Sequence, residues 1–153
     1  MSINCIRTLI EDANVSNPDK IALVFGNEKL TYRELFTKVN QIAYYLAELD
    51  LPKGSRIGIY SNKGIDQVIA ILAILSTNYV LVPLTKLLKA EQVEYIIGDC
   101  DIKCIITDKI KLESIEEIKF NGHIISYETS HKDLPSFEEI YKYYNKPYTC
   151  DVN

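Results

Sequence analysis

The loop Ser61-Asn62-Lys63-Gly64 joins a predicted strand to a predicted helix, which is a common place for anions to bind in α/β proteins. Free backbone N–H groups and the helix dipole both attract negative charge there. The sequence contains neither G-x-x-x-x-G-K-[ST] nor G-x-G-x-x-G, the glycine patterns that let a backbone wrap phosphates. The simpler interpretation makes Asn62 and Lys63 solvated turn residues, and a free-standing nucleotide-binding domain built on this loop is kept as an alternative.

Cys100, Cys104, His123 and His131 are residue types that could ligate a metal. A zinc site normally combines two closely spaced ligand pairs. Here the cysteines form one loose pair, and the two histidines lie eight positions apart, so buried or idle thiols are expected in place of a metal.

Groups for nucleophilic or acid–base catalysis are not evident. No serine or cysteine lies in a G-x-S-x-G elbow, and His123 begins an apolar strand, where a structural histidine is expected. Asp99 and Asp101 flank a cysteine at a predicted helix end. Three glutamates are typical of a solvated helix face: Glu113, Glu116 and Glu117. The sequence therefore assigns no catalytic, cofactor-binding or metal-binding residue.

Four tyrosines gather near the C-terminus: Tyr141, Tyr143, Tyr144 and Tyr148. Stacked aromatic rings can bind bases or sugars, but no arginines accompany these residues. They are interpreted as packing surface, or as a contact for a neighbouring domain.

The elements that position these residues follow from hydrophobic periodicity. A helix is predicted from Ile3 to Ala13, followed by a hairpin and by a helix that Thr31 and Glu34 begin with a capping box. Predicted strands are Ile21–Phe25, Lys29–Thr31, Arg56–Tyr60, Tyr79–Leu84, Lys103–Thr107 and His123–Ser126. Further helices are predicted at Ile65–Leu75, Ala90–Gly98, Leu112–Ile118 and Phe137–Tyr144. The alternation indicates an α/β fold with a largely parallel sheet flanked by helices.

The composition of the 153 residues suits one ordinary domain, predicted over 1–144, with 145–153 as a linker or cut end. A net charge of −4 gives no broad cationic face for nucleic acid. The longest apolar run is much shorter than the about 20 residues that span a bilayer, and the first residues do not resemble a secretory signal. A cytoplasmic protein is expected, without a membrane or nucleic-acid partner and with Cys5, Cys100, Cys104 and Cys150 reduced.

Several segments, taken in order, resemble the N-terminal region of the AMP-forming (adenylate-forming) ligase superfamily, which includes acyl-CoA synthetases, amino-acid adenylation domains and luciferases. Leu30-Thr31-Tyr32-Arg33-Glu34-Leu35 resembles its "LTYxEL" motif, and Leu51–Ile59 resembles its "GxxxGDRVAI" strand. Similar segments are Asn17–Leu23, Ala70–Leu75, Tyr79–Leu84 and Leu87–Ile97.

Two positions depart from the family pattern. Thr77-Asn78 stand where the family has an alanine or lysine followed by glycine, and Asn78 is expected to keep the turn because asparagine tolerates positive φ. Thr85 stands where an aspartate is usual, which leaves the contacts of that loop open.

The resemblance implies a ligase that uses Mg-ATP to activate a carboxylic acid as an acyl-adenylate and transfers it to a thiol of CoA or a carrier protein. The phosphate loop and catalytic lysine of that family follow the matched region, so no cofactor is expected in this chain, and its partner is expected to be the rest of the ligase. The Leu87–Ile97 segment favours a fatty or other acyl acid, with an amino acid as the other possibility. The fragment is expected to be inactive alone and to dimerise through exposed surface; the alternative is a non-catalytic module that pairs with a separate chain.

Overall fold

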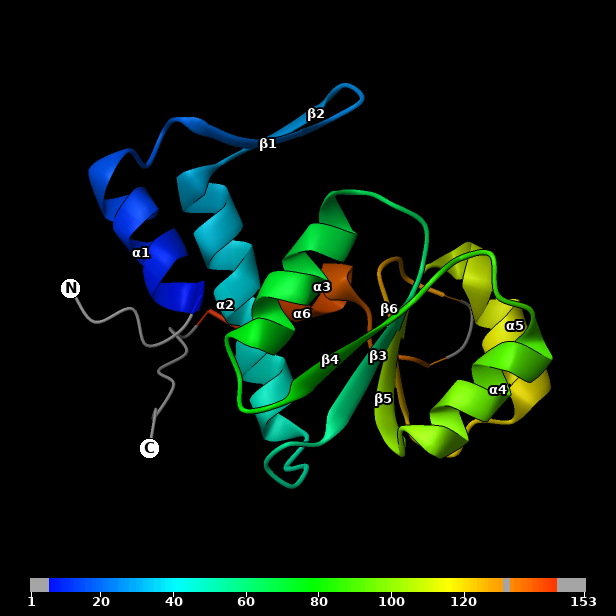
Figure 1. Ribbon diagram of the computed structural model, residues 1–153. Coiled ribbons are helices and arrows are strands. Elements are labelled where there is room, and N and C mark those ends of the chain that lie inside the picture. Colours follow the sequence, from blue (N-terminus) through cyan, green and yellow to red (C-terminus); the bar gives the residue numbers. More distant parts are fainter. Residues whose placement is uncertain (1–5, 131–132, 146–153) are drawn as a thin grey trace.

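The computed structural model describes residues 6–130 and 133–145, in which helices and strands alternate after an N-terminal helix and hairpin (Figure 1). The helices are α1 (Ile6–Ser16), α2 (Tyr32–Glu48), α3 (Ile65–Leu75), α4 (Ala90–Asp99), α5 (Lys109–Ile118) and α6 (Phe137–Tyr143). The strands are β1 (Ile21–Phe25), β2 (Glu28–Thr31), β3 (Arg56–Tyr60), β4 (Val80–Leu84), β5 (Ile102–Thr107) and β6 (His123–Ser126). Outside the described residues lie Ile3, Cys5, His131, Tyr148, Cys150 and most of the predicted linker.

The main sheet has four parallel strands in the order β4-β3-β5-β6, and β1 and β2 form a separate antiparallel hairpin. This confirms the predicted α/β class, the parallel sheet and the hairpin. None of the described helices combines the length and apolar character needed to span a bilayer.

Helices cover both faces of the sheet, with α1, α2, α3 and α6 on one side and α4 and α5 on the other (Figure 1). Consecutive residues of β5 serve opposite faces, because Ile106 packs in the core under α2 and α3 while Ile105 packs with Ile115 of α5. Burial on both faces explains why β3 and β5 are apolar over nearly their whole length.

Strand β4 forms one edge of the sheet, which accounts for a proline within it. Pro83 pairs in register with Ile59 of β3. Proline has no N–H to donate, so a strand containing it suits an edge, where one side of the backbone needs no partner.

Helix α5 begins three residues before the predicted start at Leu112. Asp108 is its N-cap, because its Oδ1 accepts the N–H of Lys111 at 2.8 Å. An aspartate directly after a strand and ahead of a periodic apolar pattern is a recognisable helix start, and this signal was missed.

The turn before β4 forms as expected, but not by positive φ at Asn78, which is a correction to the prediction. The non-glycine residues with positive φ in the described chain are Asp50, Asp101 and Lys119, each at the end of a helix. The Asn78 carbonyl accepts the N–H of Gly54 at 2.8 Å, and this bond ties the turn to the segment before β3.

Candidate functional site at the carboxyl edge of the sheet

The carboxyl ends of β3 and β5 define the switch point of the sheet. The chain leaves β3 for β4 on one side and then crosses to β5 on the other side of β3. In open α/β sheets ligands bind preferentially in the crevice at such a reversal. The residues that follow these two strands are therefore the first place to look for a site.

At the switch point, the loop after β3 is hydrogen-bonded to a carboxylate of the chain itself. Asp108, which is 6% exposed, accepts the Asn62 N–H at 2.6 Å and the Asn62 side-chain amide at 2.9 Å through Oδ2. Lys63 is exposed, as predicted, but Asn62 is half-buried and hydrogen-bonded, so its description as a solvated turn residue was wrong. One backbone donor of this loop, the Asn62 N–H, is therefore engaged by Asp108, whereas Gly64, the N-cap of α3, provides no side-chain cap.

Ser61 lies beside this pair and contacts a buried tyrosine. Its hydroxyl is 3.0 Å from the Tyr127 hydroxyl and accepts a hydrogen bond from Gln67 at 3.3 Å. Burial raises the pKa of Tyr127, and the hydrogen bond to Ser61 opposes that rise. No imidazole borders Ser61 in the described chain, where His123 starts β6 at the opposite edge, so the serine has no base to activate it.

The cysteines face different sides of the sheet. Cys104 is fully buried in the core under α2 and α3, whereas Cys100 packs against the core under α4 and α5. Both are free thiols, and burial raises the pKa of Cys104. No group of His, Cys, Asp and Glu residues that could hold a metal occurs within 6–130 and 133–145.

Asp101 belongs to an ion-pair network at the amino edge of the sheet. Its carboxylate lies 2.9 Å from Arg56 and 2.6 Å from Lys103. The hydrogen bond from Lys103 is the main cause of its lowered pKa. Arg56 also donates to the Cys100 carbonyl at 2.6 Å, so this network joins β3 to the end of α4 and has a structural role.

Two of the C-terminal tyrosines pack on α2. Lys38 lies 3.7 Å from the centre of the Tyr141 ring, and the Tyr144 hydroxyl donates to Glu48 at 2.8 Å. Partial burial and the Glu48 carboxylate raise the pKa of Tyr144 to about 12. Tyr143 is exposed. Packing surface is the correct description for Tyr141 and Tyr144.

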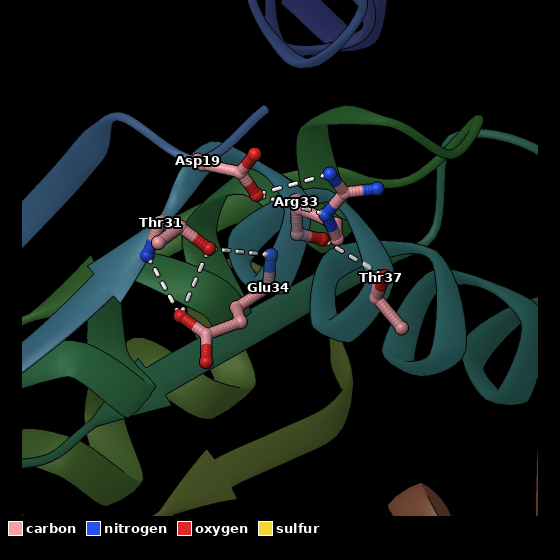
Figure 2. Close-up of polar contacts among 5 residues, drawn as sticks. All are labelled: Asp19, Thr31, Arg33, Glu34 and Thr37. Carbon is pink, nitrogen blue, oxygen red and sulfur yellow. Dashed lines mark hydrogen bonds and ion pairs between the residues drawn. The ribbon is translucent and has the colours of Figure 1, made fainter. Parts of the chain in front are cut away.

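The Leu30–Leu35 segment builds the start of α2 (Figure 2). The Glu34 carboxylate accepts the Thr31 N–H at 2.8 Å, and the Thr31 hydroxyl accepts the Glu34 N–H at 3.2 Å. Arg33 forms an ion pair with Asp19 at 3.0 Å, and Thr37 donates to the Arg33 carbonyl at 2.8 Å. The predicted capping box is confirmed, and these contacts are structural.

Two clefts open at the amino edge, away from the switch point. One, of about 210 Å³, is lined by Ala47, Asp50, Leu51, Lys53, Thr77, Asn78 and Tyr79. The other, of about 450 Å³, lies between the ends of α4 and α5 and includes Ile97, Ile102, Ile118 and Phe120. Neither contains a nucleophile beside a base.

Comparison with known proteins gives the family. A family model described as "AMP-binding enzyme" matches residues 10–148. Tyrocidine synthase 1 of Brevibacillus parabrevis is 32% identical over 120 residues, and gramicidin S synthase 1 of Brevibacillus brevis is 35% identical over 123 residues. These matches cover 78% and 80% of this chain but 11% of each relative.

Solved structures show the same fold. The anthranilate CoA ligase AuaEII superposes with a TM-score of 0.82 at 24% identity, over 90% of this chain and 28% of that one. A benzoate CoA ligase from Burkholderia xenovorans LB400 superposes with a TM-score of 0.85 at 18% identity, over 97% and 30%. The chain belongs to the AMP-binding enzyme family and corresponds to the N-terminal region of its adenylate-forming members.

Proposed function

We propose that this chain supplies the N-terminal scaffold of an AMP-forming ligase, which activates a carboxylic acid with ATP and transfers the acyl group to the thiol of CoA or a carrier protein. The observation that carries the proposal is the family match over residues 10–148. The chain spans about a tenth of tyrocidine synthase 1 and of gramicidin S synthase 1 and about three-tenths of the superposed ligases, so the activity is proposed for a larger assembly.

The described residues do not fit Mg-ATP. Asp108 is buried at the switch point and accepts the Asn62 N–H, so this N–H is not free to bind a phosphate. The described part of the chain also offers no cluster of ligands for a metal ion. We therefore propose that the chain is inactive alone and acts as a wall and support for residues supplied by the rest of the ligase.

Two classes of carboxylic acid are candidate substrates of the proposed ligase. The Leu87–Ile97 segment favours a fatty or other acyl acid. A relative at 30% identity from Amycolatopsis lactamdurans is named N-(5-amino-5-carboxypentanoyl)-L-cysteinyl-D-valine synthase, and the amino-acid units in that name support an amino acid. Both classes carry the carboxylate that attacks the α-phosphate, so the proposal requires only that group.

ATP–pyrophosphate exchange with a panel of amino and fatty acids tests the proposal. The chain alone is expected to show no exchange, and a version extended by the coding sequence that follows it is expected to exchange with one acid class. Exchange by the chain alone would contradict the scaffold role. If only a separately encoded chain restores exchange on mixing, the pairing module is the correct description.

A further inference from the structure

Two of the most exposed apolar side chains among the described residues lie on neighbouring segments at the carboxyl edge of the sheet. One segment is the loop after β4, and the other is the first turn of α5. Leu87 is 82% exposed and Ile110 is 73% exposed. Lysines flank both residues in the sequences Lys86-Leu87-Leu88-Lys89 and Lys109-Ile110-Lys111. The Leu87–Ile110 patch is defined by six residues: Lys86, Leu87, Lys89, Lys109, Ile110 and Lys111.

Hydrogen bonds connect these two segments to each other and to β3. The Lys111 ammonium donates to the Lys86 carbonyl at 2.8 Å, which links the loop after β4 to the first turn of α5. The Leu88 N–H donates to the Thr85 carbonyl at 3.1 Å, so Lys86 and Leu87 occupy the two central positions of a turn. The Leu88 carbonyl accepts the Tyr60 hydroxyl at 2.7 Å, which fixes that turn to β3.

The patch carries a local excess of positive charge. None of its four lysines forms an ion pair with another described residue. The carboxylates next to it along the chain are Glu91, Asp108 and Glu113, and Asp108 is buried and hydrogen-bonded to N–H groups. From the neighbouring end of β6, the exposed Glu128 carboxylate accepts the Lys109 N–H at 3.0 Å. Four ammonium groups thus lie near three exposed carboxylates, a local excess of positive charge in a chain whose net charge is −4.

We propose that the Leu87–Ile110 patch docks the protein on an anionic lipid surface. Leu87 and Ile110 enter the headgroup boundary, and the lysines pair with lipid phosphates and carboxylates. A projecting turn and the first turn of a helix suit insertion into a soft interface. Protein interfaces are depleted in lysine and enriched in aromatic residues and arginine, and the patch contains neither.

This inference goes beyond the proposed function, since binding needs no ligase activity. It also revises the expectation that the protein has no membrane partner. That expectation rested on the absence of a spanning segment, and surface docking requires only exposed apolar side chains and basic residues.

Flotation of the full chain with vesicles tests the proposal, with phosphatidylcholine compared with phosphatidylcholine containing about 30% phosphatidylserine. Binding is expected only to the anionic vesicles and should weaken at high salt. The double variant Lys86→Gln/Lys109→Gln is expected to bind roughly 25-fold more weakly, from about fivefold per lysine. Leu87→Ser/Ile110→Ser should also lose most binding.

The matched control is Val15→Ser/Tyr95→Ser, which removes two apolar side chains that are 76% and 72% exposed on α1 and α4. It should bind as the parent chain does, and urea unfolding of each variant verifies that it is folded. The proposal is overturned by any of three results: no binding to anionic vesicles, equal binding to neutral ones, or equal losses in patch and control variants. A patch variant that changes only self-association on gel filtration would also overturn it, in favour of a second copy.

Discussion

At the residue scale, Asp108 organises the carboxyl edge by accepting three N–H groups, two from Asn62 and one from Lys111. Asp108→Ala removes the α5 cap and leaves a half-buried donor unpaired, which should lower the free energy of unfolding by about 2–3 kcal/mol. Urea denaturation measures this loss. Asp99→Ala, at an exposed aspartate that ends α4, is the control and should cost less than about 0.5 kcal/mol. Equal effects of the two changes would refute this role of Asp108.

Two buried tyrosines provide a second contrast between single residues. The Tyr141 hydroxyl is buried without a hydrogen-bond partner among the described residues, whereas the Tyr127 hydroxyl lies 3.0 Å from Ser61 Oγ. Tyr141→Phe should therefore be neutral or stabilising, and Tyr127→Phe should cost about 1 kcal/mol. Thermal and urea unfolding of both variants compare them. A larger loss for Tyr141→Phe would show that its hydroxyl has a partner.

Contacts between residues close in sequence could be predicted, whereas contacts between residues far apart in sequence could not. The Thr31–Glu34 capping box was predicted because both residues belong to one turn of chain. The Asn62–Asp108 bond joins residues 46 positions apart, and pairing at that distance depends on the order of strands in the sheet. For this reason the loop at Ser61–Gly64 was considered as an anion site although its Asn62 N–H is engaged by Asp108.

At the scale of elements, the start of α2 should respond to pH. Hydrogen bonds from the Thr31 backbone and then its side chain lower the pKa of Glu34 below its ordinary value of 4.5. The ionised form is thus favoured in the folded state, so its stabilisation is complete above the ordinary pKa and is lost as pH falls through the folded pKa. Glu34→Gln keeps the shape of the box without titrating.

The stability difference between the parent chain and Glu34→Gln should therefore shrink between neutral pH and about pH 3. Urea unfolding at several pH values follows it. A difference that stays constant over this range would show that ionisation of Glu34 does not contribute to capping α2.

Substitutions at two glycines test how closely neighbouring segments of the chain pack against each other. A Cβ at Gly122 would lie 2.5 Å from the Lys103 carbonyl oxygen and would also clash with the Phe120 ring, so Gly122→Ala should displace the entry to β6 and cost about 1–3 kcal/mol. A Cβ at Gly98 in α4 meets nothing within 4 Å, and Gly98→Ala should be neutral or stabilising by up to about 1 kcal/mol. Unfolding free energies that rank the variants in the opposite order would contradict the packing.

Element types and most boundaries followed from hydrophobic periodicity because each depends on a short stretch of sequence. The ends of the helices were predicted less accurately from periodicity. The turns after α2 and α4 place Asp50 and Asp101 at positive φ, where the usual glycine signal is missing.

At the scale of the whole molecule, alternating strands and helices were enough to predict a largely parallel sheet flanked by helices. The order β4-β3-β5-β6 was not predicted, because each β-α-β segment can place its strand on either side of the previous one. The expected dimer stays a prediction. Exposed apolar side chains on the hairpin, among them Val24 and Phe25, offer it a surface.

If the chain is a scaffold for the rest of an adenylate-forming enzyme, as proposed, it should not bind Mg-ATP at the loop that Asp108 holds through the Asn62 N–H. Titration of the full chain with Mg-ATP, followed by calorimetry and in parallel by backbone amide NMR chemical shifts, tests this expectation most directly. No saturable heat is expected, and the amide resonances of Ser61–Gly64 and Asp108 should not shift. Saturable binding at micromolar Mg-ATP, with shifts at those residues, would contradict it and make the loop after β3 a nucleotide site.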